Sequence, residues 1–348
     1  MKKGVCIGIA CMMLALSGCA KEASRQVYAM DTVMNFTVYG KNAEDVLSSM
    51  EQRVQELENL FSRTRSASEV SRLNETGEAD VSFEVYALLE TAKEAAKATG
   101  GAFDVTIAPV VSAWGFTEDA CRVPEEGELE TLLETVGSER MELSETADGY
   151  RVSLGDGQSI DLGGIAKGYA SDCMADLFLD YGVDHALAPL AGNILAWGAK
   201  PDGTPWRIGI QDPQRADANV GVLQLENAFA VTSGAYERYF EHDGKTYHHI
   251  IDPATGYPAE SDLTSVTIVM DWSQEKLDGK TGNGTICDAL STALFVMGEE
   301  KAVEFWRSGA YDFDMVLVTA DGRLLATSGV ADIFSPTEGS GYVYEAIS

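Results

Sequence analysis

The chain has 348 residues with 45% hydrophobic and 23% charged side chains, and its formal net charge is −30 at pH 7. This length and apolar content suffice to bury a large core in one domain or two closely joined lobes, which excludes a disordered tail. The negative field repels phosphate backbones and anionic headgroups, so we expect no nucleic-acid partner and no electrostatic attachment to a membrane.

The N-terminus has the layout of a secretory signal. Two lysines precede an apolar run over residues 5–16, which is too short to span a membrane as a mature helix. The run ends in Leu16-Ser17-Gly18-Cys19, which resembles a bacterial lipobox. We therefore expect a signal peptide over residues 1–18, a lipidated Cys19, a polar tether over residues 19–26, and an extracytoplasmic location with a lipid anchor in the bacterial cell membrane. A plain signal peptide or an uncleaved anchor is the alternative, and either also places the bulk of the chain outside the cytoplasm.

The remaining cysteines form no recognisable framework. Beyond the signal and the lipidation site only Cys121, Cys173 and Cys287 are left, an odd and widely spaced set. The sequence also lacks C-x-x-C and H-x-x-x-H spacings. We therefore expect neither a disulfide framework nor a zinc cluster.

The first part of the mature chain mixes short strands with amphipathic helices. Residues 27–40 predict a strand pair or one long strand, and apolar residues at helical spacing predict helices over residues 43–61 and 83–99. A polar loop over residues 62–74 leads into a short helix. Residues 118–144 are acidic and weakly apolar, which predicts a helical surface excursion that carries no chemistry.

A glycine turn lies at the centre of the chain. Strands are predicted over residues 150–154 and 159–162, followed by Gly163-Gly164 and a helix that ends at Gly182. The first amides of a helix lack internal partners, and Lys167, one turn inside, adds positive charge. This arrangement favours an anion site, most naturally for a phosphate or pyrophosphate, although it matches neither standard nucleotide-binding loop. A tight turn without a ligand is the alternative.

The second half is rich in strands. They are predicted over residues 186–198, 206–213, 229–234, 263–270, 315–319 and 324–328, and within residues 246–258 a further strand runs into a turn marked by proline and glycine. Many are joined by short turns without strict βαβ alternation, so the expected fold class is α+β, with mainly antiparallel sheets and packed helices. His248 and His249 are neighbours on one strand and face opposite ways, so one of them can face a cleft. A purely structural histidine is the alternative.

A helix predicted over residues 287–297 carries oxygen donors on one face. Asp288 and Thr292 are four residues apart and share that face, with Ser291 beside them. Such hard oxygens suit Mg²⁺, with water and substrate phosphates completing the octahedron. The alternative is that Asp288 caps the start of the helix.

Several short motifs together resemble the ApbE family, the FAD:protein FMN transferases, over residues 27–348. In the family's order they are Met30-Asp31-Thr32, Gly101-Ala102-Phe103-Asp104-Val105 with Pro109 and Trp114-Gly115-Phe116, Asp161-Leu162-Gly163-Gly164-Ile165-Ala166-Lys167-Gly168, Thr232-Ser233-Gly234, His249-Ile250-Ile251-Asp252-Pro253 with Thr255-Gly256, and Asp288-Ala289-Leu290-Ser291-Thr292-Ala293. The resemblance implies a T-fold-like, two-lobed single catalytic unit.

The resemblance also implies a reaction and its site. FAD is cleaved at its pyrophosphate, FMN passes to a threonine hydroxyl of a target protein as a phosphoester, and AMP is released. His249 would help to activate the threonine, and Lys167 would hold phosphate. By the same carry-over Mg²⁺ would be held by Asp288, Thr292, Ser291 and the backbone carbonyl of Gly164 or Ala166. Flavin and adenosine contacts would come from Met30, Thr64, Ala102, Phe103, Asp104, Asp161, Lys167, His249 and Ile250.

Two positions depart from the family's pattern. Many members place a tyrosine near the adenine where this chain has Thr64, and the smaller residue would admit water or loosen FAD. Some members also have a second acid where this chain has Ser291, which would weaken the hold on the ion.

The expected function is therefore a lipid-anchored, Mg²⁺-dependent FMN transferase that modifies a flavoprotein of a membrane electron-transport system. An FAD pyrophosphatase, with water as the acceptor, is the alternative within enzymes. A flavin-binding lipoprotein without chemistry is a further alternative, as is an acidic scaffold without flavin affinity. Asp288, Thr292 and Lys167 argue against a mere carrier, since a carrier needs no metal-bridged pyrophosphate.

Overall fold

The computed structural model describes residues 21–116, 120–273 and 280–348. The predicted signal peptide and Cys19 lie outside these residues. Within the described part of the chain, no helix is both long enough and apolar enough to cross a membrane.

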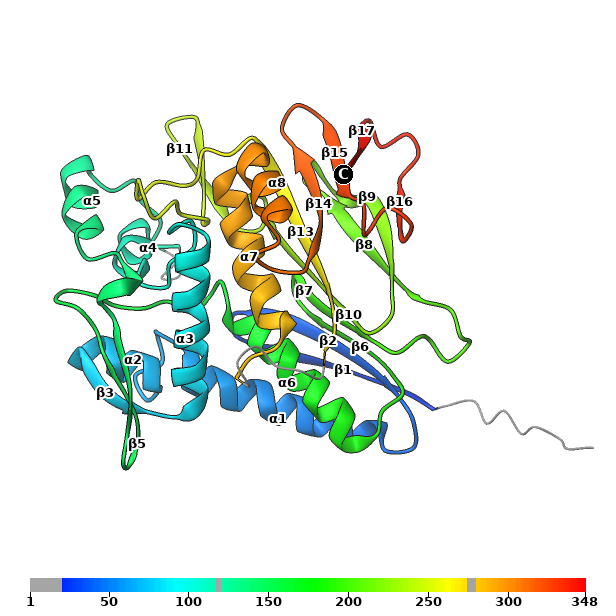
Figure 1. Ribbon diagram of the computed structural model, residues 1–348, viewed down its shortest axis with the longest axis horizontal. Coiled ribbons are helices and arrows are strands. Elements are labelled where there is room, and N and C mark those ends of the chain that lie inside the picture. The colour runs from blue at the N-terminus through cyan, green and yellow to red at the C-terminus, as the bar shows by residue number, and fades with distance from the viewer. Residues whose placement is uncertain (1–20, 117–119, 274–279) are drawn as a thin grey trace, which may run out of the picture.

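A large, mainly antiparallel sheet forms the centre of the described fold (Figure 1). Its nine strands, in spatial order, are β1 (Glu22–Ala29), β2 (Thr32–Tyr39), β6 (His185–Leu190), β7 (Asn193–Trp197), β10 (Ala228–Gly234), β13 (Leu263–Asp271), β14 (Asp314–Thr319), β15 (Arg323–Thr327) and β17 (Val343–Ile347). Every neighbouring pair is antiparallel except β15 and β17. This confirms the predicted α+β class.

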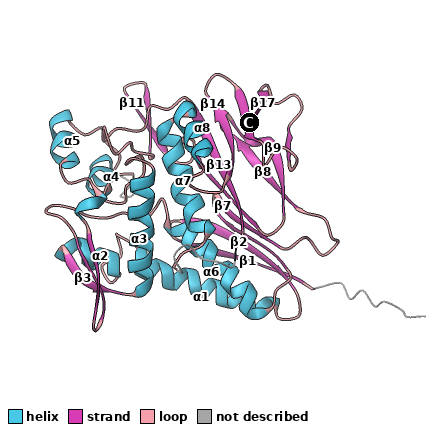
Figure 2. Cartoon of the chain, viewed as in Figure 1, coloured by secondary structure: helices cyan, strands magenta, loops and turns pink. Residues whose placement is uncertain are grey.

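Helices cover one face of this sheet and a small second sheet covers part of the other (Figure 2). The helices are α1 (Ala43–Phe61), α6 (Ala166–Tyr181), α7 (Asn283–Met297) and, beside α7, α8 (Glu299–Ser308). The small sheet consists of β16 (Phe334–Pro336), β9 (Arg215–Leu225) and β8 (Trp206–Asp212). Because β13 is covered on both faces, Ile268 packs in the helical core while Val269 packs under the small sheet. This double burial explains why the apolar residues Ile268, Val269 and Met270 follow one another without alternation.

A second lobe lies beside the helical layer. It contains α2 (Glu69–Thr76), α3 (Phe83–Ala98), α4 (Ala108–Trp114), α5 (Glu126–Leu133), the 3₁₀ helix η1 (Ser138–Arg140) and the sheet β3 (Glu78–Val81), β5 (Gly149–Ser153) and β4 (Glu142–Thr146). The hairpin β11 (Tyr239–His242) and β12 (Lys245–His248) packs on this lobe through aromatic side chains. Trp114 is fully buried there, and its ring centroid lies 5.2 Å from that of Tyr247.

Most predicted elements are confirmed, and four predictions need correction. The tether predicted over residues 19–26 is shorter, because β1 pairs with β2 from Glu22 onward and buries Ala23 and Val27. Residues 159–162 form only an isolated bridge through Ser159 instead of a strand. In residues 120–141, the described part of the predicted helical excursion over residues 118–144, the short helix α5 and η1 are the only helices before β4 begins. The helix predicted from Cys287 begins at Asn283, so Asp288 lies inside it and cannot cap it.

Candidate functional site

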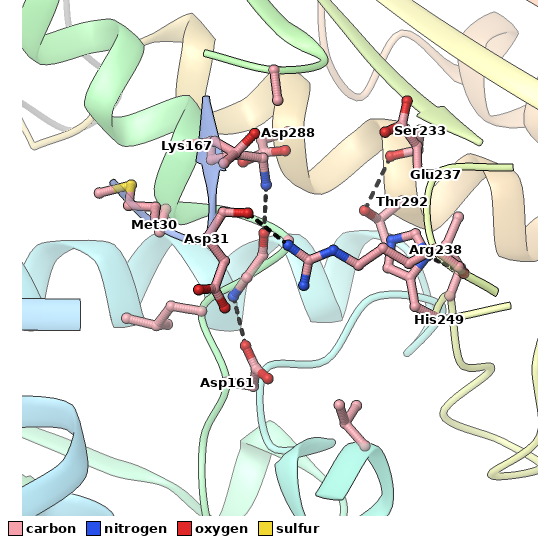
Figure 3. Close-up of a pocket in the computed structure, with 18 of the residues that line it drawn as sticks. Met30, Asp31, Asp161, Lys167, Ser233, Glu237, Arg238, His249, Asp288 and Thr292 are labelled. Atoms are coloured by element: carbon pink, nitrogen blue, oxygen red, sulfur yellow. Dashed lines mark hydrogen bonds between the residues drawn. The ribbon is translucent and has the colours of Figure 1, made fainter. Parts of the chain in front are cut away.

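A cavity of about 520 Å³ lies between the lobes, where the N-terminal end of α6, one face of α7 and the β1–β2 turn meet (Figure 3). It brings together nearly all of the predicted site residues. Those that line it are Met30, Thr64, Ala102, Phe103, Asp104, Asp161, Gly164, Ala166, Lys167, His249, Ile250, Asp288 and Thr292. Residues from both halves of the sequence therefore converge on one pocket.

The glycine turn presents positive charge and free amides to the cavity. The ammonium of Lys167 donates to the Gly163 carbonyl at 2.8 Å, which holds it beside the turn (Figure 3). Most nearby amides are bonded within the protein, which leaves fewer free amides than predicted. Among the described residues around this turn, the amides of Leu162, Gly164 and Lys167 have no acceptor. These donors and the helix N-terminus still make a site for an anion.

The crossing of α6 and α7 positions the acidic side of the site. Gly168 and Gly284 meet at the crossing, and a Cβ on Gly168 would lie only 2.7 Å from the Cβ of Asp288. Asp172 of α6 accepts hydrogen bonds from the amides of Gly282, Gly284 and Thr285 at 2.8–3.0 Å. It thereby caps the N-terminus of α7 from the neighbouring helix. The two helices are locked in register, and Asp288 is held against the start of α6.

Asp288 is nearly fully buried, and both of its carboxylate oxygens are oriented by donors. The Gly168 amide donates to Oδ2 at 2.9 Å, and the Asn193 side chain donates to Oδ1 at 3.2 Å. The Ser233 and Thr292 hydroxyls line the same cavity, with their oxygens 3.4 Å apart (Figure 3). Ser291, in contrast, is fully buried behind Ser233 and donates to the Asp288 carbonyl, so it does not line the cavity.

These oxygens fit a magnesium ion. A Cβ on Gly164 would lie 3.5 Å from the Thr292 hydroxyl, so the glycine turn packs directly against the oxygen donors. The Asn193 Oδ1 atom is buried without a hydrogen-bond partner, which is a further oxygen next to the carboxylate. Among the described residues, no three His, Cys, Asp or Glu side chains converge on a point. An ion at Asp288 therefore needs hydroxyl, backbone and ligand oxygens, as Mg²⁺ commonly has.

His249 faces the cavity, and its neighbour His248 faces the core, as the strand alternation predicted. Burial in the cavity wall lowers the pKa of His249 to about 4. Its Nδ1 lies 3.2 Å from the Arg238 carbonyl, which can only accept, so Nδ1 carries the proton. Nε2 is then left as the basic atom of a neutral imidazole.

The β1–β2 turn is strained where it meets the cavity. Met30 and Asp31 both adopt positive φ values, 51° and 56°, in a turn that usually contains Asn-Gly. The Glu58 carboxylate accepts from the Met30 amide at 3.0 Å, and the Arg238 guanidinium donates to the Asp31 carbonyl at 3.0 Å. Such strain persists only where neighbouring contacts hold it, and it is concentrated at functional sites.

Two predicted contacts have a partly structural role. Asp104 lines the cavity, but its carboxylate accepts from Thr106 and from the Ser138 amide, which braces the loop against η1. Asp161 pairs with Arg63, with 2.8 Å between Nε and Oδ2, and accepts from the Gly163 amide. The contacts of Asp161 fix the glycine turn and bring the Arg63 guanidinium to the cavity wall.

Four site residues escaped the sequence analysis as functional side chains: Arg63, Asn193, Ser233 and Arg238. Ser233 lies in a motif that was noticed but given no role, whereas the arginines lie in loops that had no signal of their own. Together with Lys167, the two arginines place cationic groups along a cavity wall that also carries carboxylates. The arrangement suits a ligand with phosphate groups and an aromatic ring system, since Phe103 and Ile250 add apolar wall.

Known proteins are similar to this chain in fold and in sequence. Residues 30–317 match the ApbE family. The chain is 34% identical to an FAD:protein FMN transferase of Treponema pallidum over 94% of each chain, and 34% identical to one of Klebsiella pneumoniae over 86% of this chain and 90% of the relative. The crystal structure of the ApbE protein of Thermotoga maritima superposes with a TM-score of 0.80 at 31% identity, covering 90% of this chain and 99% of the other.

Proposed function

The chain belongs to the ApbE family, and from this premise and the cavity we infer that it is an FAD:protein FMN transferase. The observation that carries the inference is the convergence of Asp288, Thr292, Lys167 and His249 on one cavity. An anion site, an oxygen-donor face and a neutral base are the groups that cleavage of a pyrophosphate and transfer to a hydroxyl require.

The chemistry assigns a role to each group. The acceptor threonine hydroxyl attacks the phosphorus of the FMN half of FAD, the P–O bond to the AMP phosphate breaks, and AMP leaves. The hydroxyl proton passes to Nε2 of His249, while the Gly164 and Lys167 amides and the Lys167 ammonium bind phosphate oxygens. We propose that Asp288, Thr292 and Ser233 hold Mg²⁺, with the Gly164 turn beside them. When bound, the ion neutralises charge on the pyrophosphate.

The direct test is a labelling experiment. The purified mature chain is incubated with FAD, Mg²⁺ and a protein bearing a candidate acceptor threonine. A flavin-fluorescent band on a denaturing gel, together with AMP, supports the transferase. FAD that binds but is not consumed with Mg²⁺ present would instead favour a flavin carrier.

Replacing His249 by glutamine is expected to lower the rate of transfer by about 10²-fold or more, because the hydroxyl then has no base. FAD binding should remain within a few-fold. Because the pKa of His249 is lowered to about 4, the unmutated chain should lose transfer only as the pH falls through about 4, where the imidazole becomes charged. Rates measured from pH 3.5 to 8 test this, with the exposed His242→Gln as the control. An acid limb near 6.5, or equal loss of binding and transfer, would contradict the assignment.

An FAD pyrophosphatase is the second candidate, and Thr64 favours it. Thr64 is exposed at the edge of the cavity, and its side chain contacts only Ser62 by hydrogen bonding. An aromatic ring at this position is larger than the threonine side chain and would exclude water from the adenine side of the cavity. Thr64→Tyr is therefore expected to raise the ratio of FMN transferred to FMN released, measured from the gel and from free flavin. An unchanged ratio would show that this position does not control water.

We further propose that the chain is an extracytoplasmic lipoprotein anchored through Cys19 and that its target is a threonine of a membrane electron-transport flavoprotein. The lipobox-like residues and the polar start of the described chain support the anchor. Cys19→Ala is expected to move the protein from the membrane fraction to the soluble fraction, as followed by immunoblotting. Continued membrane attachment would indicate an uncleaved anchor.

A further inference from the structure

The outward face of the β1–β2 hairpin is polar along most of its length and apolar only beside the cavity. Ser24 and Thr37 face each other across the strands with their hydroxyls 3.1 Å apart, and the Gln26 amide donates to Asn35 at 3.0 Å. The last pair on this outward face is different. It pairs Tyr28 with Val33, which are 70% and 45% exposed.

This apolar rung continues into the rim of the cavity. Tyr28 lines the cavity, and the strained turn that Arg238 contacts follows it directly. Tyr239 follows Arg238 in the chain, begins β11 and is 57% exposed. His249 adjoins Arg238 through the hydrogen bond to its carbonyl. Tyr28, Val33 and Tyr239, which we call the mouth patch, therefore flank the entrance to the proposed base.

The other large apolar side chains exposed in the described chain lie elsewhere. Phe83 begins α3, Leu179 and Tyr181 lie at the far end of α6, and Val343 and Tyr344 lie on β17 at the opposite edge of the large sheet. Exposed apolar side chains that gather at the mouth of a site are typical of contact surfaces, and tyrosines contribute strongly to binding there.

We propose that the mouth patch is the docking surface for the threonine-bearing segment of the acceptor protein, which packs an apolar side chain against Tyr28 and Val33. The proposal rests on the transferase function. A transferase must admit a second macromolecule at the cavity mouth, and the acceptor hydroxyl has to come within reach of His249. Tyr28 lines the cavity, and Arg238 contacts both the adjoining turn and His249. A segment packed on the patch therefore leads directly to Nε2 of His249.

The test uses variants at the two patch residues that do not line the cavity. Val33→Ser combined with Tyr239→Ser is expected to raise KM for the acceptor about tenfold, since two exposed apolar contacts are lost. The dissociation constant for FAD and kcat at saturating acceptor should stay within twofold. Val343→Ser is the matched control, because this valine is 61% exposed on the opposite edge of the sheet.

The outcomes separate the two proposals. The unmutated chain is first tested on a set of acceptors, one that it labels with FMN is then used for every variant, and each variant is checked for an unchanged melting temperature. If the double variant has an unchanged KM for that acceptor, the docking surface is overturned while the transferase function stands. If the unmutated chain labels no acceptor and releases only FMN and AMP, both are overturned. A raised KM that Val343→Ser does not reproduce supports the mouth patch.

Discussion

Asp288→Asn is expected to lower Mg²⁺-dependent cleavage of FAD by about 10³-fold. The described residues place no other carboxylate on this face of α7, so the change removes the negative charge that would hold the ion. The replacement keeps the size of the side chain and can still accept one of the two hydrogen bonds from Gly168 and Asn193. AMP release is measured over a range of Mg²⁺ concentrations.

Two controls make this result specific. Asp180→Asn changes an exposed acid at the far end of α6 and should leave cleavage within twofold. FAD binding to Asp288→Asn is measured separately without Mg²⁺, together with its thermal unfolding. A folded variant that still cleaves FAD at an unchanged rate and an unchanged Mg²⁺ requirement would remove Asp288 from the metal assignment.

Gly168→Ala is expected to abolish activity and to lower the free energy of unfolding by about 3 kcal/mol, at the upper end of what overpacking usually costs. The added methyl group would overlap the Gly284 carbonyl and lie 2.7 Å from the Cβ of Asp288. Neither neighbour is the end of a flexible side chain, so α6 and α7 have to move apart. That movement displaces Asp288 from the start of α6.

Gly127→Ala is the matched control for this substitution. Gly127 also lies in a helix, α5, but a Cβ there would have no atom within 4 Å. The change should stabilise the protein by about 0.5–1 kcal/mol, because alanine loses less backbone freedom than glycine on folding. Denaturant unfolding of both variants gives the comparison. Equal stability of the two would show that the helices tolerate a methyl group at the crossing.

The candidate site was only partly visible in the sequence. The Asp288–Thr292 face and the glycine turn were predicted because helical spacing and glycines act locally. Asn193 carried no local signal, since its role comes from a hydrogen bond to a helix that begins 90 residues later. The same holds for Arg238, which acts through the distant carbonyl of Asp31. The predicted metal ligand Ser291 was misplaced for the same reason. It lies behind Ser233 of β10, and the sequence does not tell which hydroxyl of α7 that strand covers.

The local sequence by itself determined the limits of α1, the end of α6 at Gly182 and the α+β class. Each of these depends on periodicity, capping or composition, which act over a few residues. Only the tertiary structure decided that β1 begins at Glu22, that Asp288 lies within α7 and that Asp104 braces a loop. Those outcomes depend on which distant strand, helix or amide is adjacent, and adjacency is set by packing of the whole chain.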